Sequence, residues 1–298
     1  MPPPSMPRQL AEAATAPGPS RSGTQPTAGH RPGETPTRLT DVQHEDAPPA
    51  QSIHSRVLSV VASRICGSDG RGAEGQSCLE MLSDALVESD DSFDRALGRL
   101  RSQHGLGDEE IVDCYIPAVA CQLGADWMEN RRSFADVTIG TARLIAAVRD
   151  LSRRWTADSV ADWRAPSIVM VVPETEQHRL GAMIAASRFR RLGVSVQMLL
   201  GRSDEEVVSA VRNGQFDMIS FSLAALERVE QTRRLIHMLR QSVASLSPIV
   251  VGGAIGMSSE ELRLQLGADH VVSDPEEALR LCGVSVRKRG DAAPRAPA

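Results

Sequence analysis

The feature that most constrains the fold is an alternation of short apolar runs with helix-like segments between residues 167 and 281. The apolar runs are Ser167–Val172, Val194–Leu200, Met218–Phe221, Ile249–Val251 and His270–Val272. Segments with one apolar helical face separate and follow them, at Arg179–Leu192, Asp204–Asn213, Leu226–Val243, Ser259–Leu266 and Pro275–Leu281. Strands that alternate with helices form parallel sheets, because each crossover needs a connection as long as a helix. The sequence therefore predicts an α/β domain over residues 167–286, with a Rossmann-like parallel five-stranded sheet.

The segment before this domain, residues 51–156, has helical periodicity and no strand pattern. Apolar faces predict helices at Ile53–Gly67, Cys78–Val87, Ser92–Ser102, from Asp108 to about Gly124 and Ser133–Trp155. Asp90 and Asp91 suit the cap of the third helix, and Pro117 predicts a kink in the fourth. Ser133 and Asp136 have the spacing of a capping box. These residues predict an all-α helix bundle that forms a cap before the α/β domain.

The two ends of the chain have a different composition. Residues 1–50 hold 11 of the 18 prolines and almost no large apolar residues, so we predict a disordered tail. Such a tail is either inert or an arm that binds a partner. Residues 287–298 predict a second disordered tail, and residues 157–166 a linker between bundle and sheet.

Composition excludes several classes of protein. The net charge of −5 gives no bulk attraction to nucleic acid, and we expect the arginine pairs and runs to be solvated helix faces. These are Arg131-Arg132, Arg188–Arg191 and Arg233-Arg234. Direct nucleic-acid contact stays open as the alternative. Five scattered cysteines without CxxC spacing are typical of reduced thiols. No apolar run approaches the ~20 residues that span a bilayer, and no signal peptide is visible, so we expect a cytoplasmic protein without membrane contact.

A polar loop after the first predicted strand carries Glu176-x-His178-x-x-Gly181. Open α/β sheets bind ligands at the carboxyl ends of their strands, so His178 is predicted to be a metal ligand. Glu176 is placed to fix the tautomer of His178, and Gly181 lets the backbone approach a flat ligand closely. The alternative is an ordinary surface histidine.

Two further motifs follow later strands. Ser222 comes after the third predicted strand, and Gly252-Gly253 after the fourth. In a doubly wound sheet these loops meet the His178 loop at one edge. A histidine, a hydroxyl and a glycine pair suit a large cofactor with a metal and a buried tail.

Together these motifs resemble the cobalamin-binding domain family, with its Asp-x-His-x-x-Gly, Ser-x-Leu and Gly-Gly pattern. The resemblance implies base-off binding of adenosyl-, methyl- or hydroxocobalamin. It then makes His178 the lower cobalt ligand, with Glu176 its paired acid. Gly181 matches the loop glycine, Ser222 the serine that contacts the nucleotide tail, and Gly252 and Gly253 the glycines that line its tunnel. The chain departs from the pattern in having glutamate at 176 and alanine at 224.

The bundle resembles the helical cap of cobalamin-dependent regulators. Trp127 matches a tryptophan that covers the upper cobalt face in light-sensing relatives, and its alternative is an ordinary core residue. Val137-Thr138 occupy the Glu-His positions that follow it there, so an upper histidine ligand is not carried over. The run from Phe134 to Gly140 resembles the AerR/PpaA group of photosynthesis antirepressors.

These resemblances imply a transcriptional regulator that binds cobalamin, responds to light or corrinoid supply, and acts by binding a repressor-type transcription factor. The alternative is a corrinoid carrier of a methyltransferase system. A third possibility is a family fold that has lost its cofactor. We expect no enzymatic activity, because Ser222 has no histidine base at a recognisable spacing.

Overall fold

A computed structural model describes residues 72–153, 155, 165–173, 179–224, 226–253 and 257–286. Both predicted tails, the predicted helix Ile53–Gly67 and most of the predicted linker lie outside these ranges. Glu176 and His178 also lie outside them. Within the described ranges, no helix is both long and apolar enough to cross a membrane.

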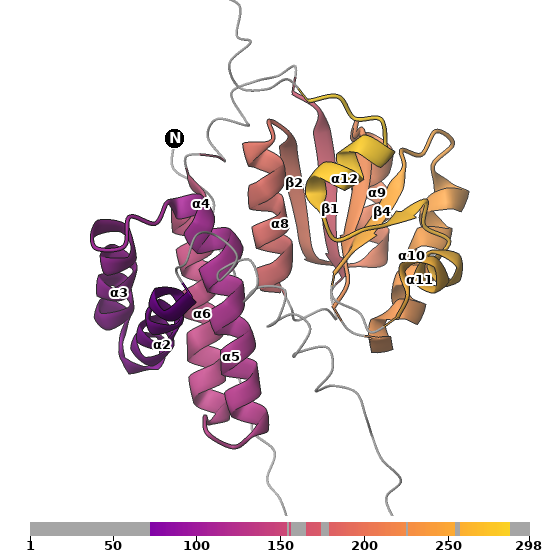
Figure 1. Ribbon diagram of the computed structural model, residues 1–298. Helices are drawn as coiled ribbons and strands as arrows, with labels where there is room; N and C mark the ends of the chain where they lie inside the picture. The colour runs from indigo at the N-terminus through magenta and orange to yellow at the C-terminus, as the bar shows by residue number, and fades with distance from the viewer. Residues whose placement is uncertain are drawn as a thin grey trace, which may run out of the picture. The chain divides into compact units, whose positions relative to one another are not determined.

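The first described region is a bundle of helices around one apolar core (Figure 1). Its elements are α2 (Gly72–Glu88), α3 (Asp90–Ser102), α4 (Asp108–Glu110), η1 (Ile111–Tyr115), α5 (Ile116–Met128) and α6 (Phe134–Leu151). Leu82, Leu100, Ile111 and Leu144 are fully buried in this core, each from a different helix. The predicted helical cap is confirmed.

Local details of the bundle refine the expectations. Helix α3 is capped by Ser89, whose hydroxyl accepts from the Ser92 N–H, while Asp90 and Asp91 occupy its first turn. The aspartates therefore face the positive helix end without capping it. The capping box of Ser133 and Asp136 is confirmed at the start of α6. That helix ends at Leu151, earlier than the predicted Trp155.

Pro117 lies at the start of α5, directly after a single turn of π-helix over Ile111–Tyr115. A proline ring clashes with the carbonyl four residues earlier, which here belongs to Asp113. The wider π turn ends just before the proline and moves Asp113 around the helix axis. The expected irregularity is therefore a π turn that keeps the helix continuous.

The second described region is a parallel five-stranded sheet with strand order β2-β1-β3-β4-β5. The strands are β1 (Ser167–Pro173), β2 (Ser195–Arg202), β3 (Met218–Ser222), β4 (Ile249–Gly252) and β5 (His270–Val271). The helices are α8 (Arg179–Arg191), α9 (Asp204–Asn213), α10 (Val229–Ser242), α11 (Ser259–Leu266) and α12 (Pro275–Leu281), with a 3-10 turn, η2, at Leu226–Arg228. The predicted Rossmann-like α/β fold is confirmed, and each strand differs from its prediction only at its ends.

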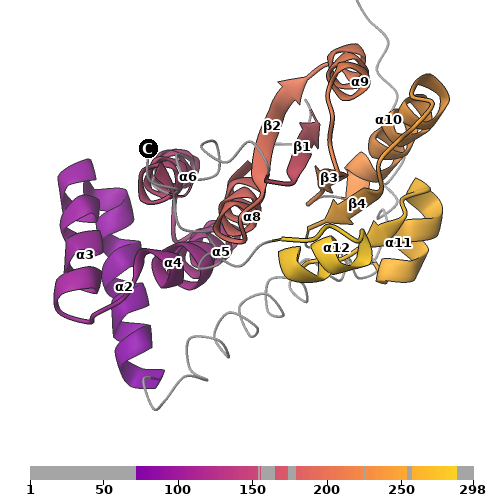
Figure 2. The same ribbon diagram turned by 90° about the horizontal axis from the view of Figure 1, so that it is seen from above.

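The helices divide between the two faces of the sheet. Helices α9, α10 and α11 share one apolar cluster with β1, β3 and β4, whereas α8 and α12 share the other. In Figure 1, α8 and α12 lie in front of the sheet, and Figure 2 gives the view from above. Because side chains alternate along a strand, neighbouring residues of β3 belong to opposite faces.

The strand order creates a topological switch between β1 and β3. The chain leaves β1 through α8 to reach β2 on one side, and returns through α9 to β3 on the other. The connections after these two strands therefore diverge at their carboxyl ends. Open α/β sheets bind their ligands in the crevice formed there. The segments after Pro173 and Ser222 therefore border this crevice.

Candidate functional site

Ser222 and the glycine pair are brought together at the carboxyl edge of the sheet. Ser222 is the register partner of Gly252 across the β3–β4 pair. One residue further on, the Leu223 N–H donates to the Gly252 carbonyl at 2.8 Å. Ser222 is half-buried and Gly253 is exposed, so this corner is open to solvent. The prediction that the two motifs meet is confirmed.

The loop with His178 begins and ends beside this corner. Strand β1 pairs with β3, with Val171 opposite Phe221, and ends at Pro173. Helix α8 begins at Arg179, so residues 174–178 connect the carboxyl end of β1 to the first turn of α8. The strand before the loop is therefore the direct neighbour of the strand that carries Ser222. The positions of Glu176 and His178 within the loop stay a prediction.

The backbone itself requires glycine at position 253. Gly253 has φ +137°, and a Cβ placed there would lie 1.7 Å from the Leu223 carbonyl oxygen. A Cβ on Gly252 would meet the Val272 carbonyl oxygen at 3.1 Å. The glycine pair therefore lets the turn after β4 pass close against the end of β3. This close approach keeps the corner beside Ser222 free of side chains.

Gly181 lies in the first turn of α8, within the predicted helix Arg179–Leu192, so the glycine of the motif belongs to the helix that follows the loop. It is exposed, and a Cβ placed on it would meet no atom within 4 Å among the described residues. A glycine within a helix costs roughly 0.5–1 kcal/mol relative to alanine. Since no described protein contact requires it, Gly181 leaves a bare backbone surface directly after the loop.

The face of the sheet beneath α8 carries serines on β3 and alanines on α8, beside larger apolar side chains. Ser220 and Ser222 alternate with Phe221 and so lie on the α8 side, together with Met170 and Val172 of β1. From α8, the residues packed on this face are Ala182, Ala185, Ala186 and Phe189. Hydroxyls and methyl groups near the carboxyl edge suit a narrow slot for a flat group with polar atoms. The residues present therefore fit the buried tail of a large cofactor.

Trp127 is not a core residue of the bundle. Its side chain is 49% exposed, while Trp155 is 2% exposed and packs in the bundle core. Trp127 lies in the last turn of α5, next to Met128, and Phe134 at the start of α6 is 73% exposed. The structure therefore removes the core alternative and leaves an apolar surface at the α5–α6 turn.

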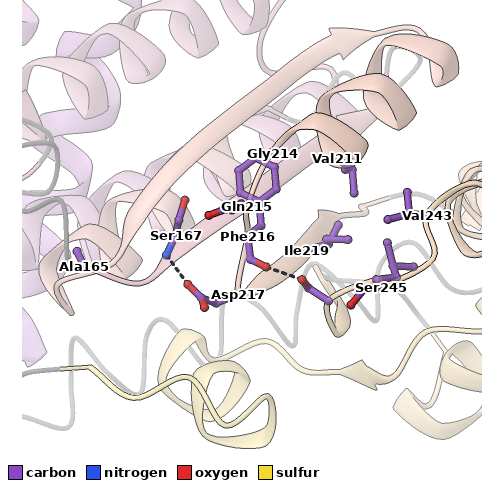
Figure 3. Close-up of a pocket in the computed structure, with 12 residues that line it drawn as sticks. Ala165, Ser167, Val211, Gly214, Gln215, Phe216, Asp217, Ile219, Val243 and Ser245 are labelled. Carbon is purple, nitrogen blue, oxygen red and sulfur yellow. Dashed lines mark hydrogen bonds between the residues drawn. The ribbon is translucent and has the colours of Figure 1, made fainter.

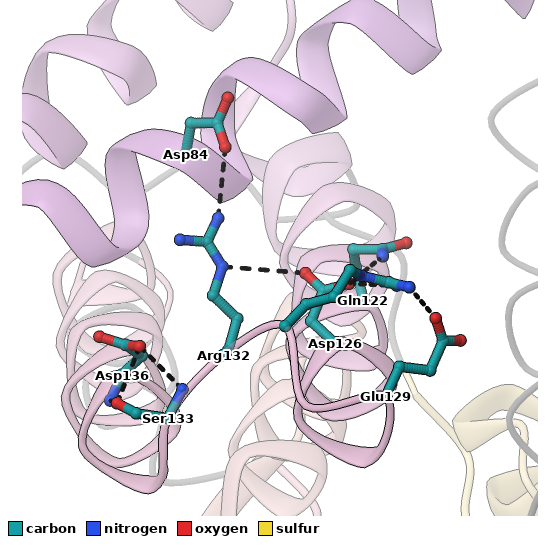
Figure 4. Close-up of polar contacts among 8 residues, drawn as sticks. Asp84, Gln122, Asp126, Glu129, Arg132, Ser133 and Asp136 are labelled. Carbon is teal, nitrogen blue, oxygen red and sulfur yellow. Dashed lines mark hydrogen bonds and ion pairs between the residues drawn. The ribbon is translucent and has the colours of Figure 1, made fainter.

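A polar network fixes the shape of this turn (Figure 4). The Asp126 carboxylate is nearly buried and accepts from Arg131 at 2.6 Å and from Gln122 at 2.7 Å. Its backbone carbonyl accepts from the Arg131 and Arg132 N–H groups at 2.7 and 3.2 Å. The Arg132 guanidinium reaches across to Asp84 of α2 at 3.3 Å. Trp127 is therefore presented on a rigid turn.

Arg188 and Arg191 of α8 form ion pairs with Asp113 of the bundle, whereas Arg190 bonds within the sheet region. The expectation of a solvated face is wrong for these three arginines. Arg191 forms an ion pair with Asp113 and lies over the Trp155 ring, 4.7 Å from its centroid. Arg188 bonds Asp274 at 3.0 Å. Arg190 donates to the Val196 carbonyl at 3.1 Å, and burial lowers its pKa. Sequence reasoning missed this role, although Arg188 and Arg191 are spaced three apart, as neighbours on one helix face are.

The remaining arginine pairs follow a simpler pattern. Arg131 and Arg132 lie in the α5–α6 turn, bonded as described above. Arg233 forms an exposed ion pair with Glu230 one turn earlier in α10, as a solvated helix face predicts. No basic surface free of neighbouring carboxylates is therefore formed by these residues.

The described residues hold no clustered metal ligands, and three of their thiols have raised pKa values. No group of three His, Cys, Asp or Glu side chains within them could hold a metal ion. Cys282 has a pKa raised to about 11, first by burial and then by the charge of Asp269. Burial also raises the pKa of Cys78 and Cys121. These thiols are therefore poor nucleophiles at neutral pH.

A groove of about 640 Å³ lies at the opposite edge of the sheet, at the amino ends of the strands (Figure 3). Ser167, Asp217 and Ser247 are among the residues that line it. The Asp217 carboxylate accepts from the Ser167 N–H at 2.8 Å, so it serves to hold the backbone. The groove lies away from the carboxyl edge and contains none of the predicted site residues.

Comparisons with known proteins agree with this geometry. The B12 binding domain family matches residues 166–282, a span of 117 residues. An uncharacterized 20.5 kDa protein in the bchF-crtJ intergenic region of Rhodobacter capsulatus is 34% identical over 166 residues, which cover 56% of this chain and 86% of that protein. The HTH-type transcriptional repressor CarH of Myxococcus xanthus is 33% identical over 117 residues, 39% of this chain and 38% of the repressor.

Among solved structures, the monomethylamine corrinoid protein of Methanosarcina barkeri has a similar fold. The TM-score is 0.56 at 13% sequence identity, over 70% of this chain and 98% of that protein. At this identity the likeness establishes the fold alone. The family match and the architecture of the carboxyl edge together establish that the sheet region is a B12-binding domain, with cobalamin as its cofactor.

Proposed function

This chain belongs to the same family as the uncharacterized 20.5 kDa protein of the Rhodobacter capsulatus bchF-crtJ region, and its residues 166–282 match the B12 binding domain. We propose that it is a cobalamin-dependent regulator of transcription that binds a protein partner. The match to that relative is 49 residues longer than the B12-binding domain, the difference between 166 and 117. The observation that carries the proposal is the 33% identity with a transcriptional repressor. In this proposal the partner is a repressor of photosynthesis genes, as in the AerR/PpaA group.

The carboxyl edge of the sheet holds the lower half of the cofactor. His178 would coordinate the cobalt, and Glu176 would accept a hydrogen bond from the second ring nitrogen of His178 and so fix its tautomer. Gly181 gives the corrin ring close access to the first turn of α8. The nucleotide tail enters on the α8 side of the sheet, past Ser222 and the bare corner at Gly252-Gly253. The small side chains there support this placement.

The bundle covers the upper face of the cofactor. Trp127 is half-exposed on a turn that Asp126 holds rigid, as an aromatic cover requires. When bound, cobalamin supplies a cobalt centre whose upper ligand is released by light or exchanged. Val137 and Thr138 provide no imidazole to replace that ligand, so the response depends on steric packing against Trp127.

The role is regulatory and not catalytic. Among the described residues, Ser222 has no histidine within hydrogen-bonding distance. The pKa values of the Cys78, Cys121 and Cys282 thiols are raised. A change in the group bound to the cobalt would alter how the bundle packs against the cofactor, and would give two states with different affinity for a partner. Helix α8 contacts both the sheet and the bundle core, through Leu180, Met183 and Ile184 on the bundle side. It is therefore the element through which such a change passes.

The proposal is tested by loading the full-length protein with adenosyl-, methyl- and hydroxocobalamin in the dark and recording absorption spectra before and after illumination. We expect retention of the corrinoid and a spectral change for the two alkyl forms. His178→Ala should give the spectrum of a corrinoid without a histidine lower ligand. His237→Ala is the matched control, because His237 is exposed on α10 and forms a hydrogen bond with Gln241 of the same helix. Absence of any retained corrinoid would refute the proposal.

A second measurement separates a regulator from a corrinoid carrier. The dark and illuminated proteins are titrated with a purified repressor of photosynthesis genes. A regulator binds the repressor with an affinity that differs between the two states. A carrier shows no such binding and instead passes the methyl group of bound methylcobalamin to an acceptor when a methyltransferase is added.

A further inference from the structure

An apolar groove of about 650 Å³ runs along the outside of the bundle between α3 and α6. Its floor is formed by Phe93 and Leu97 of α3 and by Ala146 and Leu151 of α6, among others. Ile139, at one end of the groove, is 48% exposed. An apolar channel between two helices is the shape that accepts an amphipathic helix.

Carboxylates dominate the rim of this groove. Asp90, Asp94 and Asp150 line it, and Asp94 has no ion-pair partner within the described part of the chain. The two arginines of the rim are held by the bundle. Arg101 bonds Asp108 at 2.8 Å, and Arg143 bonds the Leu86 carbonyl at 2.6 Å and also pairs with Asp90. The groove therefore fits a helix that carries positive charge beside its apolar face.

The sequence of the chain predicts a helix of this kind over Ile53–Cys66. Ile53, Val57, Val60 and Val61 recur at helical spacing and form one apolar face. Arg56 flanks this face and Arg64 continues it one turn further on. No acidic residue occurs from Gln51 to Ser68, so the segment is purely basic. Its pattern and charge are complementary to the groove.

The lengths also agree. A helix over Ile53–Cys66 is about 21 Å long, and the stretch of α3 from Asp90 to Arg101 that lines the groove is about 17 Å long. Helices α2 and α3 are joined only by Ser89 and pack against each other, so Gly72 lies near the Arg101 end of the groove. Residues 67–71 span up to ~17 Å when extended, which is enough to join that end to Gly72.

We propose that the α3–α6 groove is the docking surface for the Ile53–Cys66 segment of the same chain. The segment runs towards Gly72 with its apolar face in the groove. Arg56 then lies at the Asp90–Asp94 end and Arg64 near Asp150. Asp150 also forms an exposed ion pair with Arg153, one helical turn further on. Exposed pairs contribute little to stability, so Asp150 can exchange Arg153 for Arg64. While the segment is docked, the groove is closed to any other protein.

Hydrogen exchange of the full-length protein tests this docking. We expect the amide hydrogens of residues 53–66 to be protected at least about tenfold relative to those of residues 1–50. Val60→Glu places a charge in the apolar contact and should remove this protection. Ser59→Glu is the matched control, because it places the same charge on the opposite side of the helix and should leave the protection intact. Equal exchange in residues 53–66 and 1–50 of the unaltered protein would overturn the proposal.

The groove side is tested by a reciprocal change. Ile139→Glu should remove the protection of residues 53–66, whereas Leu264→Glu should not. Leu264 is a suitable control, because it is 67% exposed on α11 and far from the bundle in sequence. If Ile139→Glu leaves the segment as protected as before, the segment occupies some other surface and the proposal is wrong.

A charge swap identifies the register. Arg64→Glu and Asp150→Arg should each reduce the protection of the segment by roughly threefold, and the double variant should restore it. Docking within one chain predicts protection that does not depend on protein concentration and a monomer by light scattering. Protection that appears only in a concentration-dependent dimer would mean that the segment occupies the groove of a second copy. That result would overturn docking within one chain.

Discussion

The two faces of the sheet are built from the same strands but differ in their side chains. On the side of α9, α10 and α11, the core is made of large residues, with Phe221 of β3 among them. On the side of α8 and α12, β3 contributes Ser220 and Ser222, and α8 contributes mainly alanines. The first face supplies the apolar burial that stabilises the domain, while the second keeps its carboxyl edge narrow and partly polar. Stability and cofactor binding are thus assigned to opposite sides of one strand.

The largest effect is expected from Phe221→Ala, which leaves a cavity in the face packed by large residues. Removing a fully buried phenylalanine costs about 3–5 kcal/mol of unfolding free energy. Ser222→Ala, the next residue on the other face, should cost less than about 1 kcal/mol. Denaturant unfolding of the full-length chain measures both. Similar losses in the two variants would contradict the division between the faces.

A smaller effect is expected from Asp113→Ala, which removes the partner of Arg191 at the bundle side of α8. The Asp113 and Arg191 side chains are 24% and 12% exposed. Removing one member of a fully buried ion pair costs 3–5 kcal/mol, so about 2–3 kcal/mol is expected for this partly exposed pair. One Asp113 oxygen and one Arg191 nitrogen lack hydrogen-bond partners among the described residues, which limits what the pair contributes.

The control for the Asp113–Arg191 ion pair is Glu230→Ala, which breaks the exposed ion pair with Arg233. It should leave the unfolding midpoint unchanged, because fully exposed pairs contribute little. If both variants unfold at the wild-type midpoint, α8 is held against the bundle by its apolar contacts alone.

An effect of about 1 kcal/mol at pH 7 is expected from Asp274→Ala, which removes the cap of α12 on the same face as α8. Partial burial acts to raise the pKa of Asp274. The N–H groups of Glu277 and Glu276 and the Arg188 guanidinium outweigh it, so the pKa is lowered. A carboxyl whose pKa is lower in the folded than in the unfolded state stabilises the fold at pH values above its unfolded pKa. This stabilisation is lost as the pH falls through the folded pKa.

Unfolding measured from pH 7 down to pH 3 checks this sign. The difference between wild type and Asp274→Ala should stay constant to about pH 5 and close below about pH 4. A difference that grows on acidification would show that the charge of Asp274 does not stabilise α12.

The smallest change in stability, and of opposite sign, is expected from Gly181→Ala. The site lies in a helix with open space around the new Cβ, so stability should rise by up to about 0.5–1 kcal/mol. Cobalamin retention should fall, because the methyl group occupies surface that the proposed corrin ring needs. Unfolding and equilibrium dialysis of the same preparation measure both effects. A stabilised variant with unchanged retention would remove Gly181 from the cofactor site.

Local patterns predicted most of the fold. The five strands follow from apolar runs of strand length, and the α6 capping box follows from Ser133 and Asp136 three residues apart. The meeting of Ser222 with Gly252 also follows from the sequence, because parallel strands align their carboxyl ends. Each of these features depends on residues close in the chain or on a general rule of parallel sheets.

Other features depend on which distant elements meet, and the sequence could not supply them. The sequence fits either Trp127 or Trp155 as a core residue, and only packing shows that Trp155 is buried while Trp127 is half-exposed. Arg188 and Arg191 look like a solvated helix face until Asp113 and Asp274 are brought beside them.

By itself, the sequence determined a B12-binding α/β domain preceded by a helical cap, because periodicity and motif order are local properties. The tertiary structure decided that α8 contacts both regions, that Trp155 is buried while Trp127 is half-exposed, and that the two serines of β3 lie on the α8 side of the sheet. These features depend on contacts between side chains far apart in the chain, which no local sequence pattern predicts.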